Sequence, residues 1–331
     1  MVRKLCFLTA NKFYKGGYME KIRMKQNDSI SFEELFDMFI KVKKAQNLAD
    51  DSIKYYIRCY ISFSKFYDPK NACSDITSLT LIEYINNQQE NVDIKDVTIN
   101  TQLRGIKSIL YYGMEQGYLS RFKIQLLKCE KEIKEVYSDE ELKRLLKKPS
   151  IKKCSFVEYR NWVITNYLLA TANRLSTLTS VKVCDIFFEN NEIYLRKTKN
   201  RRQYIIPLSS KLSSVLREYM HHRGGNDNDY LFCTIYGTKL SNRALQDSIM
   251  KYNHQRGVLK TSVHLYRNTF AKHYLLEGGD IIRLKEILGH SSLEMVKVYV
   301  DMYSNDLKVN FDRFNPLDNI SENRKVMFKK G

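Results

Sequence analysis

The chain has 331 residues, and its 55 Lys and Arg against 37 Asp and Glu give a net charge of +18. A protein this basic usually has a polyanionic partner, foremost nucleic acid, although a basic surface that serves solubility is an alternative. Its seven cysteines form no C-x-x-C pair, which argues against a zinc site or a disulfide framework and favours a reducing cytoplasm. No apolar run is long enough to span a bilayer, and no signal-peptide core is present.

The first segment, residues 1–27, is basic and has no helical or strand pattern. We interpret it as a flexible arm that could contact DNA phosphates. A solvated tail, or an extension upstream of a natural start at Met19 or Met24, explains it equally simply. The low proline and glycine content of the rest of the chain predicts an ordered and mostly helical protein in two domains.

Residues 28–122 predict a helical bundle with four helices. The helix starts are indicated by Ser31 with Glu34, Asp51, Thr80 with Glu83, and Thr98. Gly117 ends the fourth helix. The aromatic stripes of these helices are expected to pack inward. Four basic residues of these helices are candidate DNA contacts, although they could equally be ordinary solvated charges: Lys54, Arg58, Arg104 and Lys107.

Residues 123–137 are rich in charge and contain no Gly or Pro, so we interpret them as a linker. Capping boxes at Ser138 with Glu141 and at Ser155 with Glu158 then start two helices. The second of these, SFVEYRNWVITNYLLATA, is apolar enough to be a central core helix.

A small antiparallel sheet is predicted next. The stretch IFFENNEIYLRKT, with a tight turn at Asn190 and Asn191, and the stretch RQYIIPL have strand character. Helices are expected at 210–222 and 242–255. His221 and His222 would lie at a helix C-terminus, and they lack a carboxylate or Cys partner that would make them a metal site.

Residues 263–303 predict three short helices. Gly278 and Gly279 end the first, Asp280 caps the second and Gly289 ends it, and Ser291 with Glu294 is a capping box for the third. This places His264 and Arg267 one turn apart on the first helix, His290 on a turn, and Tyr299 on the third helix. Two imidazoles, a guanidinium and a phenol in one segment are side chains suited to work on a phosphate.

The pattern H-x-x-R, then L-G-H, then Tyr nine residues later resembles the second signature box of the tyrosine recombinases, the phage integrase family. The segment ATANRLSTLTS is similar to the first box of the family, T-G-L-R-x-S-E-L. It supplies Arg174, and it departs from the pattern at Asn173 and at Thr177, where an acidic residue is common.

The resemblance also implies a lysine on the turn before Pro207. Lys199 matches it by position, and the neighbouring Lys197, Arg201 and Arg202 are candidate DNA contacts. Alternatively, all four simply contact the phosphate backbone.

The resemblance assigns catalysis to six residues: Arg174, Lys199, His264, Arg267, His290 and Tyr299. Tyr299 would attack the phosphorus while the arginines and His290 hold the oxygens, with His264 helping to remove the phenolic proton. Lys199 would protonate the leaving 5′-oxygen. A 3′-phosphotyrosine and a Holliday junction would be the intermediates, and no metal or cofactor would be needed.

The implied fold is mostly α with a small antiparallel sheet. A helical core-binding domain at 28–122 and a catalytic domain at 138–305 would form a C-shaped clamp on DNA, and 306–331 would contact other protomers. The implied partners are double-stranded DNA with specific recombination sites, further copies in a tetramer and an accessory directionality factor, with no membrane. The implied place is the cytoplasm of a bacterium, with a phage or mobile element as the source.

Three alternatives remain at this stage. A type IB topoisomerase would use the same chemistry to relax supercoils, and a non-catalytic DNA-binding regulator would keep only the fold. A general nucleic-acid-binding protein would explain the charge but would leave the order and spacing of the six residues to coincidence.

Overall fold

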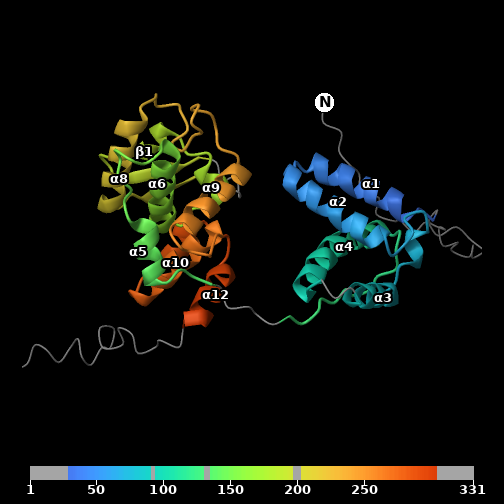
Figure 1. Cartoon of the computed structure of the whole chain (residues 1–331). Coiled ribbons are helices and arrows are strands. Elements are labelled where there is room, and N and C mark those ends of the chain that lie inside the picture. Colours follow the sequence, from blue (N-terminus) through green and yellow to red (C-terminus); the bar gives the residue numbers. More distant parts are fainter. Residues whose placement is uncertain (1–28, 91–93, 130–134, 197–202, 304–331) are drawn as a thin grey trace, which may run out of the picture. The chain divides into compact units, whose positions relative to one another are not determined.

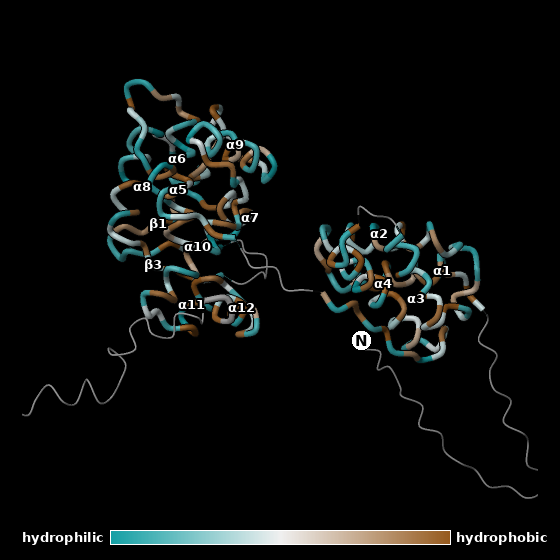
Figure 2. Tube along the Cα trace, turned by 60° about the horizontal axis from the view of Figure 1, so that its bottom comes forward, coloured by the Kyte–Doolittle hydropathy of each residue, from teal (hydrophilic) through white to brown (hydrophobic). Residues whose placement is uncertain are grey.

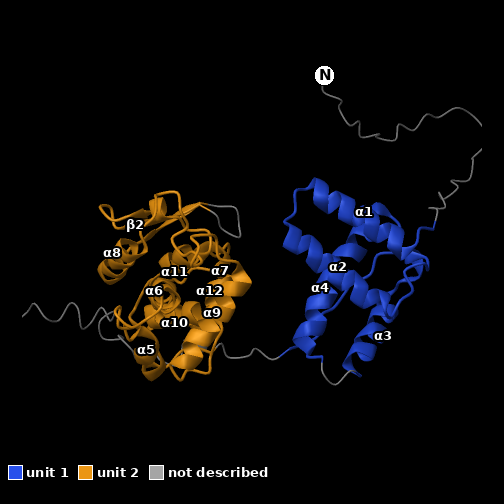
Figure 3. Ribbon diagram, turned by 45° about the horizontal axis from the view of Figure 1, so that its top comes forward, with its two compact units in different colours: residues 1–131 blue, residues 132–331 orange. Residues whose placement is uncertain are grey.

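The structure is a computed structural model that describes residues 29–90, 94–129, 135–196 and 203–303. It divides into two compact units, residues 1–131 and 132–331 (Figure 3). The described part is mostly helical with one small antiparallel sheet, as the sequence predicts. Within it, no helix is long and apolar enough to cross a membrane.

Unit 1 is a helical bundle with a 3₁₀ turn at Cys73–Asp75. Its helices are α1 (Phe32–Ala45), α2 (Asp50–Ser64), α3 (Ser78–Gln89) and α4 (Asp96–Gln116). The longest of them, α4, packs against the other three (Figure 1). Gly105 of α4 lies directly against Cys59 of α2, and Gly113 lies against Leu35 of α1. The absence of side chains at these two glycines lets the helices approach closely.

The helix starts in unit 1 are partly as predicted. The starts predicted at Asp51 and Thr98 are wrong, because Asp51 is the second residue of α2 and Thr98 is the third residue of α4. The capping box at Ser31 and Glu34 is present, with the Glu34 carboxylate accepting from the Ser31 N–H at 2.8 Å. The start predicted at Thr80 is wrong, because Thr77 caps α3 and Thr80 is its third residue. Thr77, Thr80 and Glu83 are spaced by three, so the sequence contains two overlapping capping pairs. The earlier pair gives α3 an additional turn of backbone hydrogen bonds.

Unit 2 is built around one central helix, α6 (Phe156–Thr171). Four helices pack around it: α5 (Asp139–Leu146), α8 (Ser210–Arg223), α9 (Asn242–Gln255) and α10 (Val263–Leu276). The capping box at Ser138 is present, whereas at α6 only one half of the predicted box is given by the structure, the Ser155 hydroxyl accepting from the Glu158 N–H at 3.2 Å. In Figure 2 the brown, apolar segments gather toward the interior of each unit.

The sheet of unit 2 has the order β1-β2-β3 and is antiparallel throughout. Its strands are β1 (Ile186–Phe187), β2 (Glu192–Leu195) and β3 (Tyr204–Pro207). Asn191 takes a left-handed conformation (φ 55°) in the predicted turn between β1 and β2. Ile193 pairs with Ile206 in the register of β2 and β3, and both side chains enter the main core of the unit.

The last helices form a smaller apolar cluster with the chain near Ala172. They are α10, α11 (Ile281–Leu288) and α12 (Glu294–Tyr303), and Leu284, Leu288 and Val296 are buried between them. As predicted, Asp280 caps α11 and Gly289 ends it in a left-handed conformation.

The expected capping box at Ser291 and Glu294 is wrong. The Leu293 carbonyl accepts the first backbone bonds of α12, from Val296 and Lys297. Ser291 therefore lies before the first turn, and its hydroxyl contacts the Met295 sulfur at 3.6 Å.

Candidate active site

Two arginines from distant parts of unit 2 meet at the end of α11. Arg174 immediately precedes the short helix α7 (Leu175–Leu178), and Arg267 lies on α10. The Arg267 guanidinium donates to the Ala172 carbonyl at 2.7 Å and to the Leu288 carbonyl at 2.5 Å. Arg174 donates to the Gly289 carbonyl at 3.3 and 3.4 Å. The last carbonyls of a helix form its negative end, which favours these cations.

The backbone at Ala172 is part of this arrangement. Ala172 ends α6 in a left-handed conformation with φ 52°, which costs a residue other than glycine roughly 1 kcal/mol. The conformation turns the chain so that the Ala172 carbonyl faces Arg267. The strain therefore lies at the point where the two arginines are brought together.

The two guanidiniums lie close together with no neutralising carboxylate among the described residues. Only 5% of Arg267 is exposed, and burial together with Arg174 lowers the pKa of Arg267 to about 10, so it is still charged at neutral pH. Within the described ranges, neither arginine forms an ion pair with a carboxylate. An anion bound between them would relieve their repulsion, and a phosphate fits two planar forks.

His290 and Tyr299 complete the cluster. The His290 Nε2 atom lies 2.7 Å from the Arg267 guanidinium. Tyr299, on α12, is 3% exposed, and its hydroxyl donates to the Asn268 side-chain oxygen at 3.0 Å. Burial raises the pKa of Tyr299, while the charges of Arg267 and Arg174 oppose that rise. The phenol is thus buried beside the positive charge that would stabilise its ionised form.

Tyr204 and Asn268 belong to this cluster and carry no local signal in the sequence. The Tyr204 hydroxyl lies so close to Gly289 that a Cβ there would be 2.9 Å from it. Burial raises the pKa of Tyr204, and Arg267 and Arg174 oppose this rise as they do at Tyr299. Tyr204 meets the cluster only through the tertiary fold, whereas Asn268 is next to Arg267 in the sequence but is linked to Tyr299 only by the fold, so the family motifs include neither of them.

Two predicted site residues remain, His264 and Lys199. His264 is exposed on the first turn of α10, whereas Arg267 on the next turn is buried. Lys199 lies outside the described residues, as do three basic neighbours: Lys197, Arg201 and Arg202.

The two departures from the first family box are both buried. Asn173 donates from its side-chain nitrogen to the Tyr167 hydroxyl at 2.9 Å, which explains how a polar residue is accommodated at a position where leucine is common. Thr177 is 2% exposed, and its N–H bonds to the Arg174 carbonyl at 3.0 Å. Its neutral side chain does not supply the negative charge of the acidic residue that is common at this position.

The candidate DNA contacts of unit 1 lie along the crossing of α2 and α4. Lys54, Arg58 and Arg104 are exposed, while the Lys107 ammonium lies 5.1 Å above the ring of Tyr111. Arg58 lowers the pKa of Cys59, and Arg104 lowers that of Tyr55, although burial raises both overall. Because Cys59 and Tyr55 both contact Gly105, basic residues from both helices flank the same crossing.

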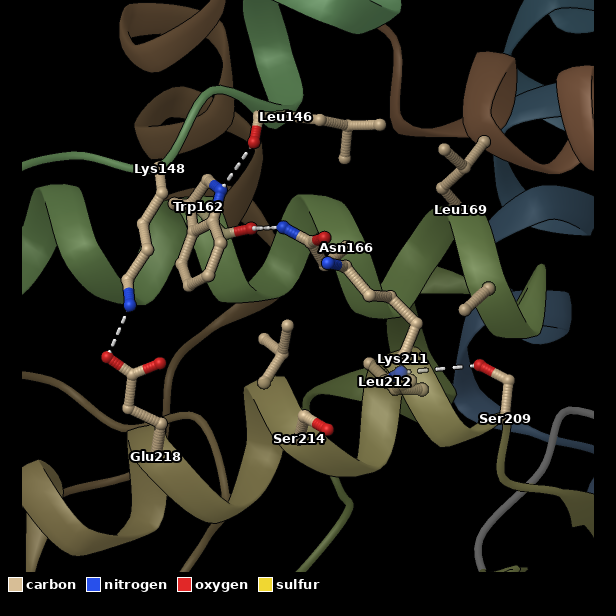
Figure 4. A pocket seen from close by; sticks show the side chains of 12 residues that line it. Leu146, Lys148, Trp162, Asn166, Leu169, Ser209, Lys211, Leu212, Ser214 and Glu218 are labelled. Carbon is tan, nitrogen blue, oxygen red and sulfur yellow. Dashed lines mark hydrogen bonds and ion pairs between the residues drawn. The ribbon is translucent and has the colours of Figure 1, made fainter.

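Two cavities of unit 2 are lined by none of the residues of the arginine cluster. One of about 480 Å³ lies between α6 and α8 (Figure 4), with Trp162 and the ion pair of Lys148 and Glu218 at one end and Lys211 at the other. Another of about 550 Å³ is lined by residues of α5 and α10, among them Phe270. No group of three or more potential metal ligands occurs in the part of the chain that the structure describes.

Comparison with known proteins gives a consistent result. The sequence profile of the phage integrase family matches residues 135–306. The chain is 25% identical over 293 residues to the tyrosine recombinase XerD of Oceanobacillus iheyensis, covering 85% of this chain and 97% of that protein. It is 28% identical over 226 residues to the tyrosine recombinase XerA of Pyrococcus furiosus, covering 67% and 76%.

Two solved structures share the fold. The Tn1549 transposon integrase in complex with circular intermediate DNA matches with a TM-score of 0.67 and 19% identity, over 84% of this chain and 99% of that one. A lambda integrase tetramer bound to a Holliday junction matches with a TM-score of 0.67 and 15% identity, over 84% and 79%.

Proposed function

Because this chain belongs to the phage integrase family, we propose that it is a tyrosine site-specific recombinase that cuts and rejoins DNA strands. The observation that carries the proposal is the juxtaposition of Tyr299 with Arg174 and Arg267, a buried phenol beside two cations that lack a carboxylate partner in the described ranges. The relatives named above are tyrosine recombinases. A role in supercoil relaxation is therefore not favoured.

The proposed reaction begins with a phosphodiester bound at the two guanidiniums and His290, which take its non-bridging oxygens. The Tyr299 oxygen attacks the phosphorus, and the bond from phosphorus to the 5′-oxygen breaks. The products are a 3′-phosphotyrosine and a 5′-hydroxyl. A 5′-hydroxyl from another strand then reverses the step and releases the tyrosine, so the energy of the broken bond is retained without a cofactor.

The two proton transfers are proposed from the resemblance. His264 takes part in removing the phenolic proton, and Lys199 gives a proton to the leaving 5′-oxygen. Lys199 lies outside the described residues, and the exposure of His264 leaves its imidazole accessible to bound DNA.

The proposed partner is double-stranded DNA carrying specific recombination sites. The exposed Lys54, Arg58 and Arg104 of unit 1 support phosphate contacts by that unit, and the net charge of +18 supports a polyanionic partner overall. Each of the two units would then contact the duplex.

The first experiment tests the nucleophile. Duplexes that bind the protein are selected from random-sequence DNA, nicked near the bound site so that cleavage is not reversed, and incubated with the protein. We expect a covalent adduct on a denaturing gel, which is lost in Tyr299→Phe while DNA binding remains. Tyr236→Phe makes the same change on a tyrosine that is 83% exposed and should retain the adduct. An adduct that persists in Tyr299→Phe would overturn the assignment.

A further inference from the structure

The nucleophile proposed above is held by a side chain that no motif includes. Asn268 lies on α10, next to Arg267, and its amide oxygen accepts from the Tyr299 hydroxyl at 3.0 Å. Its amide nitrogen donates to the Glu135 carbonyl at 3.2 Å. Because a backbone carbonyl can only accept, the nitrogen must face Glu135, and the oxygen must therefore face Tyr299.

The chain around Glu135 is firmly attached to this part of unit 2. The Val136 carbonyl accepts from the Lys260 ammonium at 2.9 Å, and the Tyr137 N–H donates to the Thr269 hydroxyl at 2.9 Å. Three consecutive residues, 135–137, thus bond to α10 or to the segment just before it. They are also the first described residues after the boundary between the units at 131 and 132.

This orientation of the amide suits only one state of the tyrosine. An amide oxygen accepts from a phenol that retains its proton, but it would repel the phenolate that attacks phosphorus. An amide nitrogen would do the opposite, since it can donate to the phenolate. The two amide orientations therefore favour opposite protonation states of Tyr299, and the Glu135 carbonyl selects the protonated one.

We propose that Asn268 is a positioning residue for Tyr299: held by the Glu135 carbonyl, it keeps the hydroxyl protonated, and once released it turns its nitrogen toward the attacking oxygen. The proposal rests on the function proposed above. Among the described residues, the charged groups that face Tyr299 are Arg267 on α10, which also hydrogen-bonds to its hydroxyl, and Arg174 before α7, with His290 after α11 bonded to Arg267. The two arginines favour the phenolate form of Tyr299. The Asn268 oxygen opposes their effect when it faces the tyrosine, and the Asn268 nitrogen reinforces it.

The test is the pH dependence of adduct formation in a single turnover on the selected nicked duplex, with protein in excess. In Asn268→Asp the carboxylate can only accept, in either orientation, so we expect the pH of half-maximal rate to rise by about one unit. The maximal rate should fall about tenfold or more. In Asn268→Ala the acceptor is gone, so the half-maximal pH should fall and the maximal rate should drop less. Asn228→Asp makes the same change on an exposed turn of unit 2 and should leave the profile unchanged.

DNA affinity separates positioning from a structural role, and we expect it to change less than about threefold in all three variants. Unshifted pH profiles in Asn268→Asp and Asn268→Ala would overturn the proposal, even if both rates fell. If Asn268→Asp fails to fold, as judged by its circular dichroism, the direction of the shift in Asn268→Ala decides alone. Failure of the proposed function has a different signature, because the wild-type protein would then form no adduct or Tyr299→Phe would still form one.

Discussion

At the scale of single residues, Arg267 has a structural task as well as the proposed catalytic one. Its guanidinium connects the end of α6, the end of α11 and His290 through three contacts of 2.7 Å or less. A lysine would keep the charge but could not reach all three partners with one ammonium. These interactions therefore depend on the planar, forked shape of the guanidinium as well as on its charge.

We expect Arg267→Lys to lower the free energy of unfolding by about 2–4 kcal/mol, because buried carbonyls of Ala172 and Leu288 lose a charged donor. The rate of adduct formation should fall at least about 100-fold, since phosphate loses one of its two forks. Urea unfolding and single-turnover assays measure the two effects. Arg243→Lys, at an exposed position paired with Asp247, is the matched control and should change neither.

The sequence locates most of the residues that the structure brings together at the site. Arg174, Arg267, His290 and Tyr299 were expected from spacing and resemblance, and they lie in one cluster. Asn268 could not be recognised as a site residue, because its two partners, the Glu135 carbonyl and the Tyr299 hydroxyl, are far from it in the sequence. The same physical limit applies to Tyr204, which meets the cluster through the packing of β3 against the end of α11.

At the scale of elements, the packing of α4 against α2 in unit 1 depends on a residue without a side chain. A Cβ at Gly105 would overlap the sulfur of Cys59 and lie 2.7 Å from the Cys59 Cβ. Alanine is the better helix former by roughly 1 kcal/mol, so propensity alone would favour the substitution. The overlap with Cys59 outweighs this gain, because α2 can make room only by moving away from α4.

We therefore expect Gly105→Ala to destabilise unit 1 by about 1–3 kcal/mol net, as overpacked cores do. Thr101→Ala, at an exposed position one turn earlier on α4, should change stability by less than about 0.5 kcal/mol. Urea unfolding followed by circular dichroism distinguishes the two. Equal stability of Gly105→Ala and the wild-type protein would show that α2 and α4 can separate without loss.

The prediction of helix starts from the sequence fails where two nearby residues could each cap the helix. Thr77 and Thr80 could each start a helix, and α3 begins at the earlier of the two, which adds a turn of backbone hydrogen bonds. Ser291 and Glu294 have capping spacing, yet the turn after Gly289 moves the helix start past Ser291. Where one solution is dominant, as at Ser31 or Gly289, the prediction is correct.

At the scale of the whole molecule, we propose that the chain assembles through its C-terminal segment, residues 306–331. The segment lies outside the described residues, and its sequence contains apolar positions such as Leu307 and Phe311. The cavity of about 550 Å³ on unit 2 is lined mainly by apolar side chains, including Leu142 and Phe270, and could receive such a segment from a second copy.

Truncation after Asn305 tests this assembly. We expect the shortened protein to bind a single DNA site with unchanged affinity, because the basic residues of unit 1 and the arginine cluster remain. It should fail to form complexes larger than one protomer per site in sedimentation of the protein with DNA. Phe270→Ala, at a partly exposed position of the cavity lining, should give the same loss in the full chain if the cavity is the acceptor, whereas normal assembly by the truncated protein would contradict the role of the segment.

The attachment of residues 135–137 also determines which piece of the chain can exist as an independent catalytic module. A fragment beginning at Ser138 would keep every described helix of unit 2, yet it would lose Tyr137. This residue is 2% exposed, and its ring centroid lies 4.6 Å from that of Tyr266, with the two rings tilted by 43°. Emptying such a site costs about 3 kcal/mol or more. It would also leave Asn268 without its Glu135 anchor. When such modules are exchanged between proteins, the junction must therefore precede Glu135, so that these non-helical residues travel with the nucleophile that they help to hold.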